Sequence, residues 1–590
     1  MISRKTGSRE LLFFVILFLL GCLLTLMANQ NRGILNNDSE IWADGAGYYC
    51  YLPSTFFYHF DARKAPQGID EKTGYGFEID HNTNRISTQY FYGVSLLISP
   101  FFLIGHIVSL ATGQDELGGF SLIYNKIFDI AGVFYLVLGL FFLKKFLRNY
   151  FKEYLQYILV LVVFLGTNLF FYSIIDSLMS HLYSFVAISL FLYAMTEFLK
   201  DTSRYRYYLL MSIAYGLMII IRPTNCLIAI LFPFWDAIDG KEVISRIKLI
   251  LKPKYLFIIL GIILIMFIPQ IFFWKKMYGS FIHLQYGVGF SNWNHPKMIE
   301  VWFSTLNGLI PWSPVNLFFI SGMFFMIFRK FKNGLLILIF FLLISYIPAS
   351  YKFWYLGCGY GHRAFIEYLP VLCIPFGFLA KKIIESRRKI LKISFFVLVI
   401  IMTAFNFSLS LMASRCNFGS TWDWDYYKKQ LKRIYLVPGS KLPYTFRNDF
   451  ENELINNRNV LTNTASNSGS WSAVLDKDHE TGCEYSVIVR DFKGEIPKSI
   501  QVDLMVKKNN QGPLDAWLVC SCQKDTTIFA KEQQPLETGY MNCTSWVSVI
   551  KTFMLPRGLT PETKINIYIW NKGKKDFLID DMKIRFEEGF

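Results

Sequence analysis

Two acidic residues follow directly on apolar stretches of membrane-spanning length. They are the side chains best placed to do chemistry. Asp44 comes after the first such stretch, among two glycines and several aromatic residues, and Asp176 comes after a later one. A carboxylate at a membrane edge can stay ionised, and ionisable groups in such places commonly serve a function. Either could act as a general base that takes the proton of an attacking hydroxyl group. Asp44 alone is equally compatible with a solvated interface loop, where Trp and Tyr gather anyway.

Asp176 also has a structural interpretation. It precedes Ser177, Leu178 and Met179, where a helix is expected to begin, and Asp is a favoured helix N-cap. From the sequence, a role as helix cap and a role as catalytic base are therefore equally supported for Asp176. His181 stands near the start of the same helix, where it could bind substrate. A packed interface histidine is the more common case at such a position.

Arginines are the candidates for binding an anion. Arg222 lies beside Pro223 at the end of an apolar run, and Asn225 follows closely; Arg363 lies in a glycine-rich loop beside His362. A guanidinium group can hold a phosphate with two hydrogen bonds, and glycine-rich backbone can add amide donors. Snorkelling to the bilayer edge is the alternative.

The remaining candidates lie in other predicted outer loops. Arg85 resembles the two arginines above in its chemistry. Trp354 belongs to a group of loop aromatics that could stack on the face of a sugar. Such residues equally form the aromatic belt of a membrane interface.

Composition defines the elements that must position these residues. The 590 residues are 53% hydrophobic and include 57 Phe, which excludes an ordinary soluble protein. Apolar runs of spanning length recur from residue 11 to about residue 412. The net charge of +16 does not imply nucleic acid, because the basic residues of this part gather in short loops, as the positive-inside rule expects.

Counting the basic loops as cytoplasmic gives a multi-pass topology of about eleven spans, with the N-terminus in the cytoplasm. Residues 90–110 break this rule unless they form a helix lying in the outer interface. Residues 207–235 are interpreted as two short spans that meet at Arg222; one long helix kinked at Pro223 is the alternative. The candidate residues all fall on the outer side, and the chain after residue 440 lies outside as well.

The C-terminal part has a different pattern. Polar and apolar residues alternate over 500–506, 564–570 and 577–586, which predicts strands of a β-sandwich. We therefore expect a mainly α membrane domain over residues 1–435 and an extracytoplasmic β-sandwich over 436–590. Cys483, Cys520, Cys522 and Cys543 lie in the second domain and could form disulfides if it is exported, in a pairing that the sequence does not define.

The motifs of the first domain resemble those of the GT-C superfamily of membrane glycosyltransferases. The similarity is to a bacterial branch related to protein mannosyltransferases and aminoarabinose transferases, and covers roughly residues 10–412. It is carried by Asp44-Gly45-Ala46-Gly47-Tyr48-Tyr49 with Tyr51-Leu52-Pro53, Gly166-Thr167-Asn168 with Met179-Ser180-His181, Arg222-Pro223-Thr224-Asn225, and Gly357 to Gly361-His362-Arg363. Those relatives commonly have Asp-Glu where this chain has Asp44-Gly45. The sandwich is similar in pattern to carbohydrate-binding modules.

The resemblance implies an inverting transfer of a sugar from a polyprenyl-phosphate donor, with Asp44 as the base. The acceptor would be a glycan, a lipid or a protein, and the place the outer face of a bacterial inner membrane. Some relatives use a divalent metal ion, which Asp44 and Asp176 could hold, although the sequence contains no dedicated metal site. A flippase or transporter for lipid-linked glycans is the alternative, and would need polar residues near the bilayer midplane. A non-catalytic glycan-binding scaffold is a third possibility.

Overall fold

The computed structural model describes the chain in two compact units. Unit 1 is Met1–Gly33, Asn37–Ala65 and Gly76–Tyr435, and unit 2 is Ile34–Asn36, Pro66–Tyr75 and Leu436–Phe590. The described residues are 2–29, 35, 39–113, 118–283, 289–357, 359–413, 420–434, 445–448, 450, 460–468, 470–492, 497–509, 512–525, 527–536, 546–556 and 558–588.

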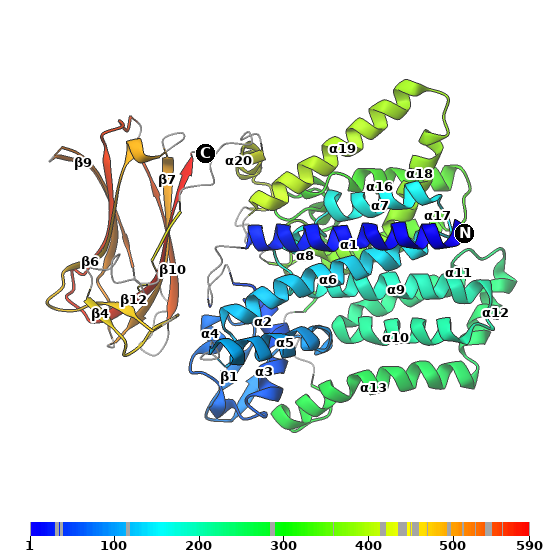
Figure 1. Ribbon diagram of the computed structural model, residues 1–590, viewed down its shortest axis with the longest axis horizontal. Coiled ribbons are helices and arrows are strands. Elements are labelled where there is room, and N and C mark those ends of the chain that lie inside the picture. Colours follow the sequence, from blue (N-terminus) through cyan, green and yellow to red (C-terminus); the bar gives the residue numbers. More distant parts are fainter. Residues whose placement is uncertain are drawn as a thin grey trace. The chain divides into compact units, whose positions relative to one another are not determined.

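Figure 1 shows a helical unit and a separate sandwich of strands. The helices are α1 (Ile2–Ala28), α2 (Asp44–Tyr49), α3 (Tyr51–Phe56), η1 (Ala62–Lys64), α4 (Ile69–Lys72), α5 (Gly93–Thr112), α6 (Leu122–Leu147), α7 (Glu153–Gly166), α8 (Phe171–Ile174), α9 (Ser180–Lys200), α10 (Tyr205–Ile221), η2 (Pro223–Ile230), α11 (Leu231–Phe234), α12 (Gly240–Ile250), α13 (Pro253–Tyr278), α14 (Met298–Phe303), α15 (Leu309–Trp312), α16 (Asn316–Phe328), α17 (Gly334–Ser350), η3 (Arg363–Tyr368), α18 (Leu369–Ile384), α19 (Lys389–Met412), α20 (Trp424–Ile434) and η4 (Val489–Asp491).

Apolar helices make up the core of unit 1. Within the described residues, seven helices are long and apolar enough to cross a membrane, and five shorter apolar ones accompany them. Each segment that the sequence predicted to cross the membrane coincides with one of these apolar helices. The predicted mainly α membrane fold is therefore confirmed, and the protein is a multi-pass membrane protein.

The segments on both sides of helix α5 contact the short helix α2. Just before α5, the hydroxyl of Tyr90 donates a hydrogen bond to Asp44. Just after it, the carbonyl of Gly119 accepts one from Tyr49. Since Asp44 and Tyr49 belong to the one short helix α2, both flanks of α5 return to the same place. These contacts favour the predicted interfacial helix, although length and composition would also allow α5 to span.

The segment 205–235 folds back on itself at Arg222. Asn225, just past the turn, donates hydrogen bonds to the Met218 carbonyl of α10 and to Ser184 of α9. The return segment η2 is wound as a 3₁₀-helix, which rises about 2.0 Å per residue instead of 1.5 Å. Because of this larger rise, a short segment can cover a greater length. The segment therefore forms two antiparallel halves and not one kinked helix, as the predicted topology requires.

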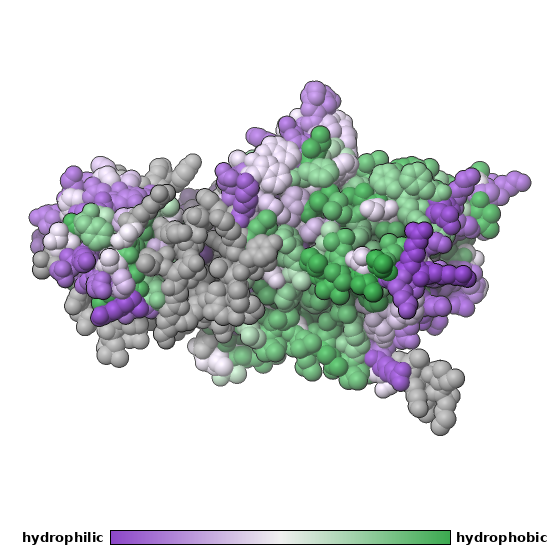
Figure 2. Space-filling view, turned by 90° about the horizontal axis from the view of Figure 1, so that it is seen from above, coloured by the Kyte–Doolittle hydropathy of each residue, from purple (hydrophilic) through white to green (hydrophobic). Residues whose placement is uncertain are grey.

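Basic residues of different predicted inner loops meet at one end of unit 1. Lys144 and Lys145 at the end of α6 pair with Glu10 of α1. At the end of α9, Glu197 pairs with Lys200, Arg148 and Arg204. Figure 2 shows apolar side chains along the flank of the helical unit and hydrophilic ones gathered at its right-hand end.

The strands of unit 2 form a β-sandwich, as predicted. One sheet has the order β10-β7-β12-β5-β4, with β3 also paired to β12, and the other has the order β6-β11-β8-β9. A separate small hairpin, β1 with β2, lies in unit 1. The strands are β1 (Glu78–Asp80), β2 (Arg85–Ser87), β3 (Thr445–Asn448), β4 (Val460–Thr462), β5 (Ser472–Leu475), β6 (Thr481–Ile488), β7 (Pro497–Lys508), β8 (Trp517–Lys524), β9 (Thr527–Pro535), β10 (Val547–Met554), β11 (Lys564–Trp570) and β12 (Phe577–Glu588).

Three of the four cysteines of the C-terminal part lie in the sandwich core. Cys520 and Cys522 of β8 are both buried free thiols. Burial raises the pKa of the Cys522 thiol to about 11 and that of Cys520 further, so both are protonated and inert near neutral pH. Cys483 is likewise a core residue, and Cys543 lies outside the described residues.

Unit 2 also takes in part of the first outer loop. Lys72 of the segment Pro66–Tyr75 donates a hydrogen bond to the carbonyl of Ser466, 3.2 Å away. Burial lowers the pKa of Lys72, and the carboxylates Asp580 and Asp581 partly offset that effect. The segment that follows Asp44 in the chain therefore belongs structurally to the sandwich.

Candidate active site

Asp44 is the first residue of the short helix α2. The residue before it, Ala43, has φ 46° and ψ −122°, a conformation that is strained for a residue with a side chain. The next turns pack without room for side chains: a Cβ at Gly47 would lie 2.3 Å from the Gly76 carbonyl and from the Tyr90 ring. The glycines around Asp44 thus allow close packing within the protein.

The Asp44 carboxylate has a partner on each oxygen. Oδ2 forms an ion pair with Nη2 of Arg363 at 2.7 Å, and Oδ1 accepts a hydrogen bond from the Tyr90 hydroxyl at 2.6 Å. The side chain of Asp44 is 31% exposed and that of Arg363 only 13%. Burial and the neighbouring Asp44 raise the pKa of Tyr90 well above its usual value, so Tyr90 remains a proton donor. The acid is thus held in a fixed orientation while one side stays open.

Asp176 does not cap helix α9. The N-cap of α9 is Met179, without a side-chain cap hydrogen bond, and Asp176 precedes it in a turn after α8. Another acid holds the turn before this helix: Oε1 of Glu40 accepts from Leu178 N and from the Ser177 hydroxyl, at 2.9 and 2.8 Å. The capping interpretation of Asp176 is therefore wrong. Glu40 instead anchors the backbone ahead of Asp44 to the segment that carries Asp176.

Asp176 nevertheless lies in the electrostatic surroundings of Asp44. Asp176, Asp44 and Arg363 all act on the pKa of the buried Tyr172 phenol, which is raised mainly by burial. The Tyr172 hydroxyl also accepts a hydrogen bond from the backbone N–H of Tyr360, at 3.0 Å. The structure thus gathers both predicted carboxylates and Arg363 around Tyr172.

A second, more deeply buried cluster centres on Glu367. Its Oε2 lies 2.7 Å from Nδ1 of His181, and its Oε1 lies 3.5 Å from Nε of Arg222. Nη1 of Arg222 donates to the hydroxyl of Ser180, which also accepts from Tyr48. Glu367 is almost fully buried, whereas the side chain of Arg222 is 23% exposed. The predicted pair Arg222 and His181 is therefore brought together by an acid.

The two clusters share the same two short helices. Asp44 and Tyr48 are four residues apart on α2, and Arg363 and Glu367 are four residues apart on η3. On the α-helix α2 this spacing places both residues on one face, and η3 is a short 3₁₀-helix that carries both of its residues within two turns. The outer pair Asp44–Arg363 and the inner Glu367 cluster are consequently parts of one site between α2, α9 and η3.

Other predicted residues have structural contacts. The amide of Asn225 donates to Ser184 and its carbonyl accepts from Tyr368, so its buried side chain ties α9 to η3. Trp354 is 7% exposed, which leaves little ring surface for a sugar. Arg85 is exposed on β2 with its guanidinium over the Tyr278 ring, 5.7 Å from the centroid, so its partner differs from those of Arg222 and Arg363.

His362 is buried beside the site and hydrogen-bonds to the backbone of the preceding loop. Its Nε2 lies 3.0 Å from the carbonyl of Trp354, so Nε2 carries the proton and Nδ1 is the acceptor. Burial lowers the pKa of His362 to about 4. His362 is therefore neutral near pH 7 and holds the loop before η3.

Sequence reasoning missed Glu367, Glu40 and Tyr90. Glu367 is the one acid in the apolar run 363–380, and a lone acid in such a run is a functional signal by the same rule that identified Arg222. Glu40 and Tyr90 carried no such signal, because an acid and a tyrosine are ordinary residues in an outer loop.

The donor set does not suit a divalent cation as it stands. Among the described residues, no group of three or more His, Cys, Asp and Glu side chains is arranged to hold a metal ion. Arg363 occupies one oxygen of Asp44, and its positive charge would repel a cation there. We derive no catalytic step through a metal.

Comparison with known proteins gives structural matches only; no family model and no curated protein matches the chain. ArnT from Cupriavidus metallidurans, solved with undecaprenyl phosphate, is similar over 72% of this chain and 69% of its own, with 13% identity and a TM-score of 0.43. The oligosaccharyltransferase AglB from Archaeoglobus fulgidus, solved with an inhibitory peptide and a dolichol-phosphate, is similar over 74% of this chain and 61% of its own, with 14% identity and a TM-score of 0.40.

A third match concerns a much smaller part of the chain. The CBM22-1 xylan-binding domain of Xyn10C from Paenibacillus barcinonensis is similar over 22% of this chain and 83% of its own, with 14% identity and a TM-score of 0.16. The solved structures that match most of the chain are GT-C glycosyltransferases, the superfamily that the sequence motifs resemble. At these TM-scores the likeness is one of chain arrangement, and the chemistry has to be argued from the site.

Proposed function

We propose that the protein is a membrane glycosyltransferase that moves a sugar from a polyprenyl-phosphate donor to an acceptor hydroxyl. The observation that carries the proposal is the part-exposed Asp44, held by Arg363 and Tyr90 at one end of a membrane bundle. An acid that is oriented and still accessible is what a general base requires. The sequence motifs that resemble GT-C enzymes include both Asp44 and Arg363.

Asp44 acts as the base in this proposal. A carboxylate has about four lone-pair positions, and the hydrogen bonds of Asp44 with Tyr90 and Arg363 leave room for an acceptor hydroxyl. The acceptor proton moves to Asp44 while the acceptor oxygen bonds to the anomeric carbon. The bond from that carbon to the phosphate oxygen breaks, and its electron pair leaves with the polyprenyl phosphate. Phosphate is a good leaving group, so the transfer inverts the anomeric centre in one step, without a covalent enzyme intermediate.

The arginines bind the donor phosphate. Protonation of Asp44 removes the negative charge that pairs with Arg363, which frees that guanidinium for the phosphate that gains charge. Arg222 sits beside Glu367 and Ser180 with part of its side chain exposed, which suits a second phosphate contact. His181 orients Glu367 and does not itself contact the phosphate in this proposal. Asp176 remains a second candidate for the base.

The buried polar side chains argue against the transport alternative. Transport through the bundle needs polar residues near the bilayer midplane. The buried residues Asp129, Gln270 and Asn406 each lie toward the Asp44 end of their helices, and Asn406 holds the carbonyls of Leu165 and Thr167. These groups stabilise the end of the bundle that carries the site.

The proposed setting is the outer face of a bacterial inner membrane, with the sandwich extracytoplasmic and able to bind glycan. The orientation follows from the basic loops at the opposite end. The test is a transfer assay with the purified protein in nanodiscs and a panel of polyprenyl-phosphate sugars. A covalent product that is lost in Asp44→Asn supports the enzyme. Movement of a labelled lipid-linked glycan across the bilayer without transfer would support a flippase, and glycan binding by the wild type without any transfer would support a scaffold.

A further inference from the structure

The helix α12 (Gly240–Ile250) carries two different exposed stripes. The first is basic: Lys241 and Lys248 follow helical spacing, and Lys252 continues it just past the helix end. The second is apolar, with Ile244, Ile247 and Leu251 exposed at 54%, 37% and 58%. A helix with adjacent basic and apolar faces lies in the interfacial plane of a bilayer, with its lysines at the level of the headgroups.

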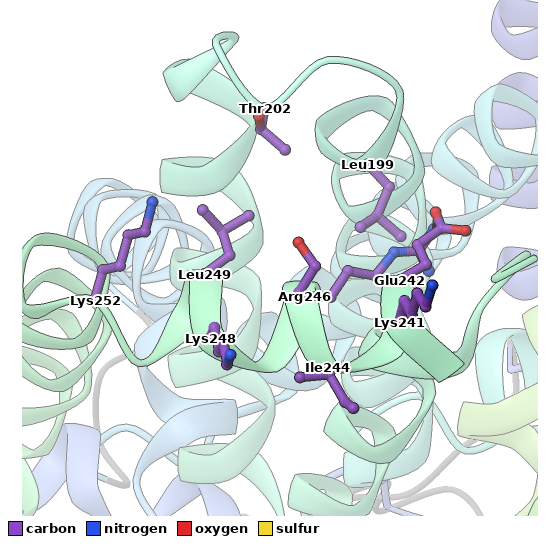
Figure 3. A pocket seen from close by; sticks show the side chains of 10 residues that line it. Leu199, Thr202, Lys241, Glu242, Ile244, Arg246, Lys248, Leu249 and Lys252 are labelled. Atoms are coloured by element: carbon purple, nitrogen blue, oxygen red, sulfur yellow. Dashed lines mark hydrogen bonds and ion pairs between the residues drawn. The ribbon is translucent and has the colours of Figure 1, made fainter. Parts of the chain in front are cut away.

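The basic stripe borders a cavity of about 740 Å³. Figure 3 shows Leu199 and Thr202, from the end of α9 and the turn after it, across the cavity from α12. Lys241, Lys248 and Lys252 are exposed along its other wall. A cavity of this volume is large enough for a phospholipid headgroup.

The charge of this cavity is strongly one-sided. Its one acid, Glu242, forms an ion pair at 2.5 Å with Arg246, which also donates to the Trp235 carbonyl. Glu242 further accepts from the backbone N–H of Ile238. Glu242 and Arg246 thus neutralise each other and fix α12 to the bundle, and the three lysines remain as an excess of positive charge.

The cavity lies at the opposite end of the bundle from Asp44. Ile41, three residues before Asp44, shows which end of the bundle carries the Asp44 site. Its N–H donates to Asn125 in the first turn of α6. Near α12, Trp235 donates to Tyr150, just past the last turn of α6. The 26 residues of α6 separate these two ends by about 39 Å. A ligand in this cavity is therefore distinct from the donor and acceptor at the Asp44 site.

We propose that α12 and the turn after α9 form a binding site for an anionic phospholipid of the leaflet at this end. The three lysines, spread along the helix, attract the anionic headgroup, the nearest of them contacts its phosphate, and the apolar stripe lies among the acyl chains. The proposal is independent of the transferase function.

The test uses the full-length protein, purified with phosphatidylglycerol in mixed micelles and examined by native mass spectrometry for retained lipid. The test variant is Lys241→Gln/Lys248→Gln/Lys252→Gln. The matched control, Lys382→Gln/Lys389→Gln/Lys392→Gln, removes the same charge from basic residues elsewhere at this end. A Lys→Arg variant at positions 241, 248 and 252 keeps the charge and guards against a folding defect.

We expect the wild type, the control and the arginine variant to retain phosphatidylglycerol. The glutamine variant should bind it roughly 10- to 100-fold more weakly, as the attraction of three lysines to an anionic headgroup implies. Equal loss in the control would show a general effect of positive charge and overturn the site, as would unchanged retention in the test variant. Displacement of the lipid by millimolar inorganic phosphate would assign the cavity to a free phosphate and overturn the lipid proposal.

Discussion

The carboxylate of Asp44 and the guanidinium of Arg363 meet at 2.7 Å although 319 positions separate them in the chain. The pair joins the first outer loop to η3, and Tyr90 completes its hydrogen bonding from the Asp44 side. It gives both residues a definite orientation at the open edge of the site. The proposed mechanism couples proton uptake by Asp44 to anion binding by Arg363.

Asp44→Asn should lower turnover by about 10² to 10⁴-fold, the usual worth of general-base catalysis. Asn keeps the size of Asp44 and can still accept from Tyr90, but it cannot take a proton. Donor binding should be kept or become tighter, because the neutral Asn no longer pairs with Arg363, one of the arginines assigned to the phosphate. Transfer rate and donor affinity are measured on the purified protein. Normal turnover, or a loss confined to donor affinity, would contradict the base assignment and make Asp176 the leading candidate.

Asp176→Asn tests whether that acid serves chemistry. Asp176 is not the N-cap of α9, and Asn caps a helix about as well as Asp in any case, so we expect the free energy of unfolding to change by less than about 0.5 kcal/mol. A fall in turnover at unchanged thermal stability would then report a role near Asp44. The comparison variant is Glu40→Gln, which weakens the acceptor for Leu178 N and should reduce stability. Loss of stability in Asp176→Asn without loss of rate would restore a structural role.

Arg222→Lys should weaken donor binding roughly tenfold, since one charge-assisted hydrogen bond of the guanidinium fork is lost. The lysine keeps the charge beside Glu367, so the fold should persist. Donor affinity is compared with that of Arg206→Lys, an exposed arginine at the other end of α10. If folded Arg222→Ala bound the donor normally, the arginine would serve the membrane edge instead.

His362 should make stability depend on pH in the acid range. Burial lowers its pKa to about 4 from an ordinary 6.5, so the unfolded chain binds more protons between these values. Stability from the neutral side chain is present above about pH 6.5 and is lost as the pH falls toward 4, by up to about 3 kcal/mol. His362→Gln should lack this slope in thermal unfolding experiments, whereas His295→Gln, in an exposed loop, should retain it.

The proposed orientation places Asp70 and Asn509 on the extracytoplasmic side and Lys241 on the cytoplasmic side. A single cysteine introduced at each position is labelled with an impermeant thiol reagent on intact and on opened cells, with the parent protein as the background control. We expect the first two to react in intact cells and the third only after opening. The reverse pattern at either outer position would contradict the topology drawn from the basic loops.

The sequence by itself determined the membrane helices and the sandwich, because hydrophobic length and alternation are local properties of the chain. It also identified Asp44, Arg222 and Arg363, since charges beside apolar runs are conspicuous. It predicted that residues 90–110 return to the outer side, and the contacts of Tyr90 and Gly119 favour this.

Only the tertiary structure decided what these residues touch. Asp44 and Arg363 belong to segments far apart in the chain, and no local pattern records their contact. Glu367 receives its role from Arg222 and His181, which come from two other helices. Asp176 looked like a helix cap from its neighbours, but the helix has its N-cap at Met179, and the long-range acid Glu40 holds the turn that carries Asp176. Pairings of this kind depend on packing between distant segments, and packing is a property of the folded chain.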